Sequence, residues 1–332
     1  MRNHTYNIEN VYLKSTFSSV GAKESDGPLA KYFDAKYSDD MLGQKSWEEA
    51  ESCLIKNTLS GALTNANMVS EDLELLFAGD LLNQCIASAF GLKAFDIPFL
   101  GLYGACSTFV EGLCLASMAI GGGYVKSAAT ITSSHFCSSQ KQYRFPLEYG
   151  EVRTPTSQWT VTGSGCAVLT NEKTDIKLSK ITVGKIVDLG VTDANNMGAA
   201  MAPSAADTIC SHLNSTNTTV DDYDCIITGD LSFVGTEILI ELMSQKGIDI
   251  RKKHLDCGSL IYDKDRQKVD AGGSGCGCVA SVFSGYFHKM MKAKKLGRIL
   301  LVGTGALMSP SSVLIGESIA GVAHGVEFEL VR

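Results

Sequence analysis

The chain has 332 residues, of which 45% are hydrophobic and 20% charged, and its formal net charge is −7 at pH 7. This composition predicts a globular protein with a large apolar core, and the acidic balance, with a pI of about 5.4, excludes a nucleic-acid-binding surface that depends on general positive charge. Eleven cysteines without paired spacing, no signal-peptide pattern and no apolar run of the ~20 residues that span a bilayer predict an intracellular protein whose membrane contact is at most peripheral.

The first hundred residues contain two strand patterns and one capped helix. Strands are expected over residues 10–19 and 73–77, and a helix over residues 46–62, where Ser46 followed by Glu49 is a capping box. The second strand ends in Gly-Asp-Leu at residues 79–81. We expect Asp80 to cap the helix that follows.

A buried strand over residues 98–103 is expected to lead into GLYGACSTFVEGL, residues 101–113, which puts Cys106 at the start of an apolar helix. Backbone N–H groups at a helix N-terminus are unpaired and carry partial positive charge. Cys106 and the amides of Ser107 and Thr108 are therefore candidates to stabilise a thiolate, an oxyanion or a bound carboxylate. The alternative is that Cys106 is a small buried core residue.

The next segment is a strand over residues 127–133 followed by a long polar and aromatic stretch, residues 135–156. A loop of that length is usually functional or disordered, and this one begins at His135 and carries Lys141, Tyr143 and Arg144. A further strand is expected over residues 159–169. Its glycines at positions 163 and 165 indicate a bulge or a close backbone approach.

Three patterns then recur in the same order. FAGDLL at residues 77–82 is echoed by ITGDLS at 227–232, YGACSTFVEGL by GGSGCGCVASV at 272–282, and SAATITSSH by RILLVGTGALMS at 298–309. The repetition predicts a duplicated α/β unit, with one half over residues 1–170, which carries the Cys106 helix, and the other over residues 171–332. By the same echo, Asp230 is expected to cap a helix as Asp80 does.

Two similar halves with a cysteine at the start of a buried helix resemble the thiolase fold, a layered αβαβα arrangement with buried central helices. Within that superfamily the chain resembles the stage V sporulation protein AD family of spore-forming bacteria. The matching stretches run in order through most of residues 76–310: LFAGDLLNQ, GLYGACSTFVEGL, ITSSH, YRFPLEYG, TVTGSG, VTDANNMGAAMAPSAADTI, IITGDLSFVG and VGTGALMSP.

The resemblance implies binding of dipicolinic acid (pyridine-2,6-dicarboxylate), free or as its calcium chelate, and support of its uptake into the developing spore with the SpoVA membrane proteins. It also implies a role connected with germination, a peripheral position on the inner spore membrane and a possible homodimer. A dianion needs backbone donors, cations and ring contacts, and the candidate ligand-binding residues are Cys106, Ser107, Thr108, His135, Lys141, Tyr143 and Arg144. No cofactor is expected, and no metal, because Cys276 and Cys278 lack a second pair of ligands.

The alternative function is a ketoacyl-synthase or thiolase type of acyl transfer through Cys106. Such chemistry needs a base within reach, and only His135 and His324 are credible site histidines, the second of them expected just before a C-terminal strand over residues 326–331. When the glycine-rich elements are superposed on those of thiolases, Val269 falls near the usual catalytic histidine, and Val302 or Gly303 near the second cysteine. Cys106 is therefore interpreted as a vestigial nucleophile position, with no catalytic residue assigned. A scaffold for a membrane complex is the third possibility.

Overall fold

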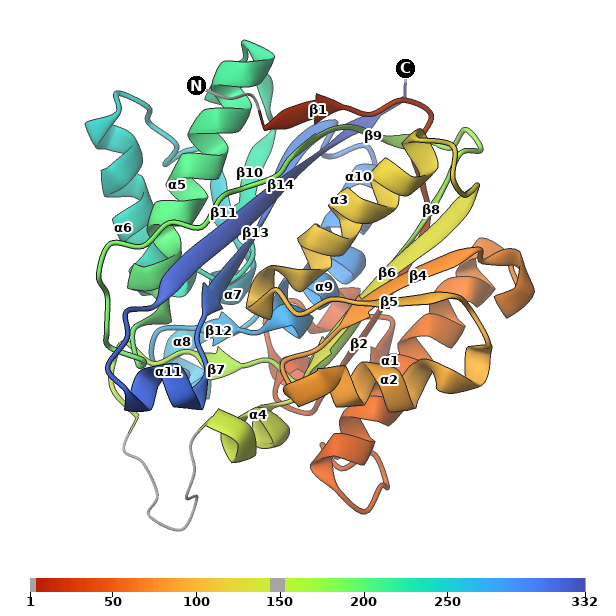
Figure 1. Ribbon diagram of the computed structural model, residues 1–332, viewed down its shortest axis with the longest axis horizontal. Coiled ribbons are helices and arrows are strands. Elements are labelled where there is room, and N and C mark those ends of the chain that lie inside the picture. Colours follow the sequence, from red (N-terminus) through yellow and green to blue (C-terminus); the bar gives the residue numbers. More distant parts are fainter. Residues whose placement is uncertain (1–3, 144–152, 332) are drawn as a thin grey trace.

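The computed structural model describes residues 4–143 and 153–331. In these residues, twelve strands form one mixed sheet along the path β11-β10-β13-β14-β9-β2-β8-β6-β4-β5, with β1 on β9 and β3 on β2, and β7 and β12 form a separate pair (Figure 1).

Up to residue 170, the elements in chain order are β1 (Thr5–Asn7), β2 (Tyr12–Val20), β3 (Ala35–Lys36), α1 (Trp47–Ala66), β4 (Leu75–Gly79), α2 (Ile86–Leu92), β5 (Phe99–Gly101), α3 (Thr108–Gly121), β6 (Ser127–Ser134), α4 (Phe136–Tyr143), β7 (Trp159–Thr160) and β8 (Gly163–Thr170).

After residue 170, the elements in chain order are β9 (Ile176–Thr182), α5 (Met197–Thr216), β10 (Cys225–Thr228), α6 (Ser232–Gln245), β11 (His254–Asp256), α7 (Cys257–Leu260), α8 (Lys264–Gln267), β12 (Gly273–Ser274), α9 (Cys276–Val282), α10 (His288–Lys292), β13 (Arg298–Leu307), α11 (Pro310–Leu314) and β14 (Ala320–Leu330). A π-helical turn, Phe283–Phe287, joins α9 to α10 into one continuous helix.

The strand order repeats along the sheet. The first five strands of the path, read in chain order as β9, β10, β11, β13 and β14, have the same arrangement as β2, β4, β5, β6 and β8. The sequence echoes fall on equivalent elements: the ends of β4 and β10, the starts of α3 and α9, and β6 and β13. The two sets of strands join where β2 meets β9, with Tyr12 opposite Lys177.

Equivalent helices also begin and end alike. Ser46 caps α1 by accepting from the Glu49 amide, as predicted, and Asn196 caps α5 by accepting from the Ala199 amide. Both helices end at an asparagine in the left-handed region, Asn67 with φ 53° and Asn217 with φ 52°. Asparagine tolerates this conformation better than most residues, so local sequence alone stops both helices.

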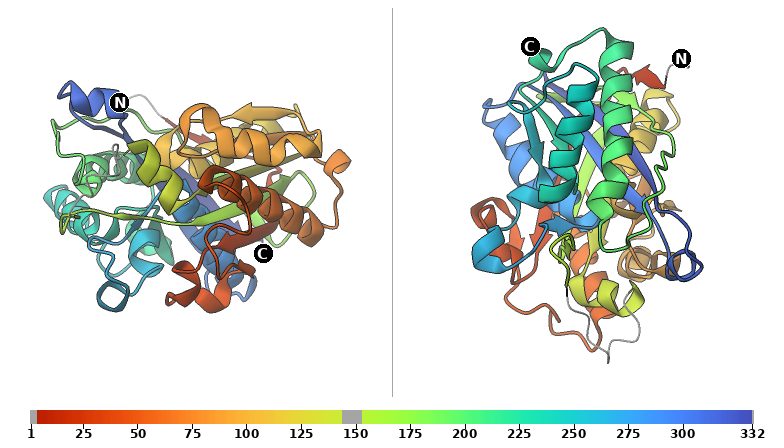
Figure 2. Two further views of the ribbon diagram at one scale, coloured as in Figure 1. Left: turned by 90° about the horizontal axis from the view of Figure 1, so that it is seen from below. Right: turned by 90° about the vertical axis from the view of Figure 1, so that its left-hand side faces the viewer.

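Two helices lie at the centre of the layers. α3 packs against β4 and β6 on one side and against β13 and β14 on the other, and every residue of α9 is buried. α1 and α2 cover the outer face of one set of strands, and α5 and α6 that of the other (Figures 1 and 2). The glycines of β8 allow this packing: a Cβ on Gly165 would lie 2.0 Å from the Ala280 carbonyl oxygen of α9, which is the close backbone approach predicted there.

Four expectations differ from the structure. β5 is not buried but lies exposed at the edge of the sheet, and residues 136–143 form the helix α4 instead of loop. The helix after Gly79 begins only at Ile86, and His324 lies inside β14 rather than before it. The apolar composition of β5 predicts burial, but it does not tell whether another element covers the strand. A helix as short as α4 has too few turns to show a clear periodic pattern.

Candidate functional site

Cys106 lies in a tight turn at the entrance to α3. A single 3₁₀ turn, Ala105–Ser107, precedes the helix, and Ala105 has φ 52°, a left-handed conformation that is rare for alanine. The Cys106 side chain is buried, and it packs with Leu81 and Cys276, with Tyr143 against them. The prediction of a cysteine at the start of a buried central helix is confirmed.

The group that faces Cys106 is a carboxyl group. The thiol donates a hydrogen bond to Asp230, whose carboxyl oxygens also accept from the Thr304 hydroxyl at 2.7 Å and from the Gly275 amide at 3.1 Å. Burial raises the pKa of Asp230 to about 7, against the opposing effect of these three hydrogen bonds. Burial, and then the negative charge of Asp230, raise the pKa of the Cys106 thiol well above its usual range.

Asp230 therefore does not cap the helix that follows it, contrary to the expectation from the sequence echo. Asp256 has that role for α6, accepting from the amides of Leu231 at 2.9 Å and Ser232 at 2.8 Å. The equivalent of Asp230 in the first set of strands, Asp80, accepts from the Ser88 amide and hydroxyl in the first turn of α2, so the capping prediction holds for Asp80 alone.

Further buried acids lie near this centre. Glu51 of α1 accepts hydrogen bonds from Ser133 at 3.0 Å and Ser138 at 2.7 Å, and burial, together with the charge of Asp80, raises the pKa of Glu51 to about 8. Burial also raises the pKa of Asp80. The interior around Cys106 is thus rich in carboxyl groups whose pKa burial raises.

The predicted donors at the helix entrance bond to the turn itself. The Ser107 hydroxyl and amide both donate to the Gly104 carbonyl oxygen, at 2.7 Å and 3.2 Å. The Thr108 hydroxyl donates to the Ala105 carbonyl oxygen at 2.6 Å, and the Thr108 amide donates to the same atom. Both side chains are fully buried.

His135 is buried at the start of α4. Its Nδ1 accepts from the Cys137 amide at 3.1 Å, so the proton is on Nε2, which donates to the Asp40 carbonyl oxygen at 2.8 Å. Burial lowers the pKa of this imidazole, which favours the neutral form. His324 likewise accepts from the Gly184 amide through Nδ1, and burial lowers its pKa to about 4.

The remaining predicted residues have separate surroundings. Tyr143 packs on the Cys106 cluster and donates to the Leu81 carbonyl oxygen at 2.7 Å, whereas Lys141 forms an ion pair with Glu48 at 2.6 Å. Arg144 lies outside the described residues. Tyr143 and Cys106 are thus brought together, and Lys141 points to α1.

The positions superposed on thiolase catalytic groups are apolar and tightly packed. Val269 and Val302 are fully buried core residues. A Cβ on Gly303 would lie 2.7 Å from the Val110 side chain of α3, and a Cβ on Gly305 would lie 2.7 Å from the Gly104 carbonyl oxygen. The end of β13 therefore packs directly against the Cys106 turn.

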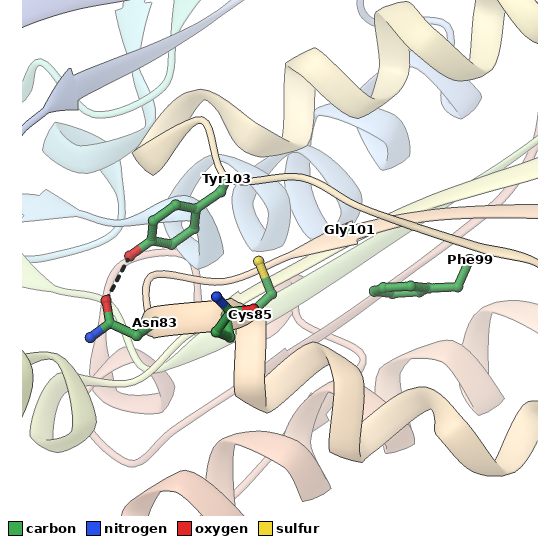
Figure 3. A pocket seen from close by; sticks show the side chains of 6 residues that line it. Asn83, Cys85, Phe99, Gly101 and Tyr103 are labelled. Atoms are coloured by element: carbon green, nitrogen blue, oxygen red, sulfur yellow. Dashed lines mark hydrogen bonds between the residues drawn. The ribbon is translucent and has the colours of Figure 1, made fainter.

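A pocket of about 640 Å³ opens beside β5 and the start of α2. It is lined by Asn83, Gln84, Cys85, Phe99, Gly101 and Tyr103 (Figure 3). Gln84 and Cys85 have φ values of 60° and 48°, and the Tyr103 hydroxyl bonds to the Leu81 carbonyl oxygen at 3.3 Å, the same atom that accepts from Tyr143. The pocket is thus linked to the Cys106 cluster through Leu81.

Neither a metal-binding cluster nor a membrane-spanning helix is present in the described residues. No group of three or more His, Cys, Asp or Glu side chains within residues 4–143 and 153–331 converges in a way that could hold a metal ion. In the same part of the chain, no helix combines the length and apolarity needed to cross a bilayer.

Comparison with solved structures identifies the fold. OleA from Xanthomonas campestris, solved as a variant, is similar with a TM-score of 0.64 and 15% identity, over 97% of this chain and 99% of that one. 3-Oxoacyl-(acyl carrier protein) synthase III from Xanthomonas oryzae pv. oryzae is similar with a TM-score of 0.63 and 15% identity, over 98% and 100%. The same enzyme from Aquifex aeolicus has a TM-score of 0.59 and 15% identity, over 96% and 99%. The predicted thiolase-like fold is confirmed.

Sequence comparison identifies the family. The family model for Stage V sporulation protein AD (SpoVAD) matches residues 2–329. Stage V sporulation protein AD from Bacillus subtilis (strain 168) is 45% identical over 319 residues, which are 96% of this chain and 94% of that protein. With the thiolase-like fold, the buried Cys106 turn and this near-complete match, the chain belongs to the Stage V sporulation protein AD family.

Proposed function

We propose that this protein binds dipicolinic acid, free or as its calcium chelate, and supports the uptake of this dianion into the developing spore together with the SpoVA membrane proteins. Family membership gives the chain a role in sporulation. The proposal adds the ligand, a connection with germination, and a peripheral position on the inner spore membrane. It also treats the thiolase-like fold as a binding scaffold rather than an acyl-transfer enzyme.

The observation that carries the binding role is the partner of Cys106. A thiol becomes a nucleophile when an imidazole or another cation favours its thiolate, whereas Asp230 opposes the thiolate. The histidines expected to act as bases, His135 and His324, each use a ring nitrogen as acceptor for a backbone amide. This arrangement opposes reaction at Cys106, which supports a binding role for the protein over acyl transfer.

Isothermal titration calorimetry of the purified protein with dipicolinate, with and without calcium, tests the proposal. We expect saturable binding at one site per chain, with pyridine-3,5-dicarboxylate as a matched control that differs only in the placement of its carboxylates. Absence of heat with dipicolinate in both conditions contradicts the binding role. Stable folding without any small-dianion binding favours a scaffold.

The second candidate function is acyl transfer through Cys106, which the fold neighbours favour because they include 3-oxoacyl-(acyl carrier protein) synthases. Incubation with acetyl and acetoacetyl thioesters, followed by intact-mass measurement, separates the two functions. We expect no adduct, since the thiol is held protonated. A stoichiometric acyl group on Cys106 supports the enzyme instead.

We also propose that two copies of the chain pair through β5. This strand ends the sheet path, and Phe99 and Leu100 are 40% and 50% exposed. The only charged residues between positions 81 and 107 are Lys93 and Asp96, so two copies of this acidic protein can approach here without strong repulsion. An unpaired edge strand is a ready template for another strand, and two identical edges can pair antiparallel about a two-fold axis.

Sedimentation velocity tests the pairing. We expect a dimer for the unmodified chain and a monomer for Leu100→Lys, because the substitution puts like charges on both sides of the axis. Tyr124→Lys is the matched control, since Tyr124 is 85% exposed on a different element. A monomer at all concentrations, or a dimer that survives Leu100→Lys, contradicts the proposal.

A further inference from the structure

Two cations converge on one tryptophan in a protein whose net charge is negative. The Arg153 guanidinium carbon lies 4.9 Å from the centre of the Trp159 ring, and Lys23 Nζ lies 4.0 Å from it. Phe136 stacks parallel to the same ring at 3.9 Å between centroids. The sequence did not predict Arg153 or Lys23 as a site residue, because these two residues and Phe136 are far apart along the chain.

The two cations have different partners. Asp270 pairs with Arg153, its Oδ2 lying 2.9 Å from Nε. Lys23 donates to the Gln267 carbonyl oxygen at 2.8 Å, and within the described residues it forms no ion pair. Burial lowers the pKa of Lys23 against the opposing charge of Glu24; Arg153 lowers it further, and Asp270 and Asp40 raise it. Arg153 thus has Asp270 as its ion-pair partner, whereas Glu24, Asp270 and Asp40 act on Lys23 without a direct ion pair.

The guanidinium is held in place and has one donor group to spare. Nη2 donates to the Gln158 carbonyl oxygen at 2.7 Å, and Nε donates to Asp270, whereas Nη1 is buried and has no hydrogen-bond partner in the part of the chain that the structure describes. Oε1 of Gln158, a residue that is only 4% exposed, is also without a partner among these residues. An unpaired buried donor is costly, and a ligand carboxylate can accept a hydrogen bond from Nη1, whereas Oε1 of Gln158 is itself an acceptor and cannot pair with a carboxylate.

Gln158 connects this cation to the Cys106 centre. Its Nε2 donates to the Asp230 carbonyl oxygen at 2.7 Å, and Asp230 in turn accepts from the Cys106 thiol. The next strand residue, Trp159, donates its amide to the Gly272 carbonyl oxygen, and β7 pairs with β12 directly before Gly275. Gln158 therefore lies between Arg153 and the groups around Cys106. Those groups are acidic, so they are unsuited to bind a dianion.

We infer that Arg153, on the Trp159 platform and with Lys23 beside it, is the group that binds a carboxylate of the ligand through Nη1. This inference rests on the proposed function, and it assigns the countercharge to Arg153 in place of Lys141, which is paired with Glu48. The chemical class recognised is a small carboxylate on a planar ring. A guanidinium stays charged at any physiological pH and is oriented here by two existing bonds.

The test compares four variants by calorimetric titration with dipicolinate. Arg153→Gln is expected to weaken binding by at least ~30-fold, the loss typical when one partner of a buried charge pair is removed, and Arg153→Lys by less, since it keeps the charge. Asp270→Asn removes the ion pair but leaves the guanidinium, so binding is expected to stay within about threefold. Arg251→Gln, at an exposed arginine paired with Asp249, controls for net charge.

Melting temperatures distinguish a ligand contact from a structural clamp. If Arg153 only ties residue 158 to Asp270, then Arg153→Gln and Asp270→Asn lose stability and binding together. That result overturns the inference, as does affinity of Arg153→Gln within threefold of the unmodified chain. Loss of binding in Arg153→Gln at a melting temperature equal to that of Asp270→Asn supports it.

A fluorescence titration makes the inference independent of the ligand's identity. The chain has two tryptophans, so Trp47→Phe leaves Trp159 as the single reporter. Benzoate and phthalate are expected to change this emission, and Arg153→Gln to abolish the change. If dipicolinate does not bind but benzoate or phthalate binds through Arg153, the proposed function is wrong and the inference is supported. If no carboxylate changes the emission, the inference is wrong.

Discussion

Replacement of Asp230 by asparagine tests whether the carboxyl group facing Cys106 is protonated in the folded protein. The pKa of Asp230 is about 7 when folded, against an ordinary value of 3.8, so the native state binds this proton more tightly than the unfolded chain. The contribution of Asp230 to the free energy of unfolding is therefore largest below pH 4, and it declines as the pH rises to 7. Each unit of pKa difference corresponds to ~1.4 kcal/mol, which makes the decline ~3 kcal/mol between pH 5 and pH 8.

The amide in Asp230→Asn has the same shape but does not titrate. Its oxygen can still accept from Thr304, but its NH₂ group then faces the Gly275 amide, which donates to the carboxyl at 3.1 Å. We expect a cost of ~1–3 kcal/mol that does not depend on pH. The variant should therefore be less stable than the unmodified chain at pH 5, with the difference shrinking or reversing at pH 8.

Urea unfolding of both proteins at pH 5 and pH 8, followed by circular dichroism, measures this change. Other buried acids, such as Glu51 with its pKa of about 8, titrate in both proteins and cancel in the comparison. Thr304→Val serves as a second variant that keeps the carboxyl group. Equal pH dependence in the unmodified chain and in Asp230→Asn would show that Asp230 is ionised throughout, and the account of the Cys106 centre would be wrong.

Three further predictions concern the same region. Thr304→Val removes a donor that favours the charged form of Asp230, so its unfolding free energy should fall by ~1–3 kcal/mol and its pH dependence should steepen, as urea titrations at two pH values will show. Gly165→Ala puts a Cβ 2.0 Å from the Ala280 carbonyl oxygen, and we expect a melting temperature many degrees lower or no soluble protein. Cys106→Ala should keep dipicolinate binding within a few-fold by calorimetry, and complete loss would give the sulfur a direct role in binding.

The elements that local chemistry determines were predictable. Ser46 and Glu49 mark the start of α1 because a cap needs only neighbouring residues, and the glycines of β8 indicate close packing because no other residue permits it. The echo of Gly-Asp-Leu at two places identified equivalent strands before any contact was known. The apolar sequence after Cys106 predicted an apolar helix, and α3 lies between the two layers.

The partners of the site residues were not predictable from the sequence. Asp80 and Asp230 have the same local sequence, yet one bonds to the first turn of α2 and the other faces Cys106 from the opposite set of strands. β5 has the composition of a buried strand and is an exposed edge. Arg153 and Lys23, which lie outside the strands, come together only at the ring of Trp159 in β7.

The sequence by itself determined the start of α1, the repeated pattern, the central helix and the family. Only the tertiary structure decided which charged groups face one another, which strand lies at the edge and which carboxyl groups have a raised pKa. The reason is physical: capping and periodicity act over a few residues, whereas burial and electrostatic interactions depend on groups brought together from distant parts of the chain.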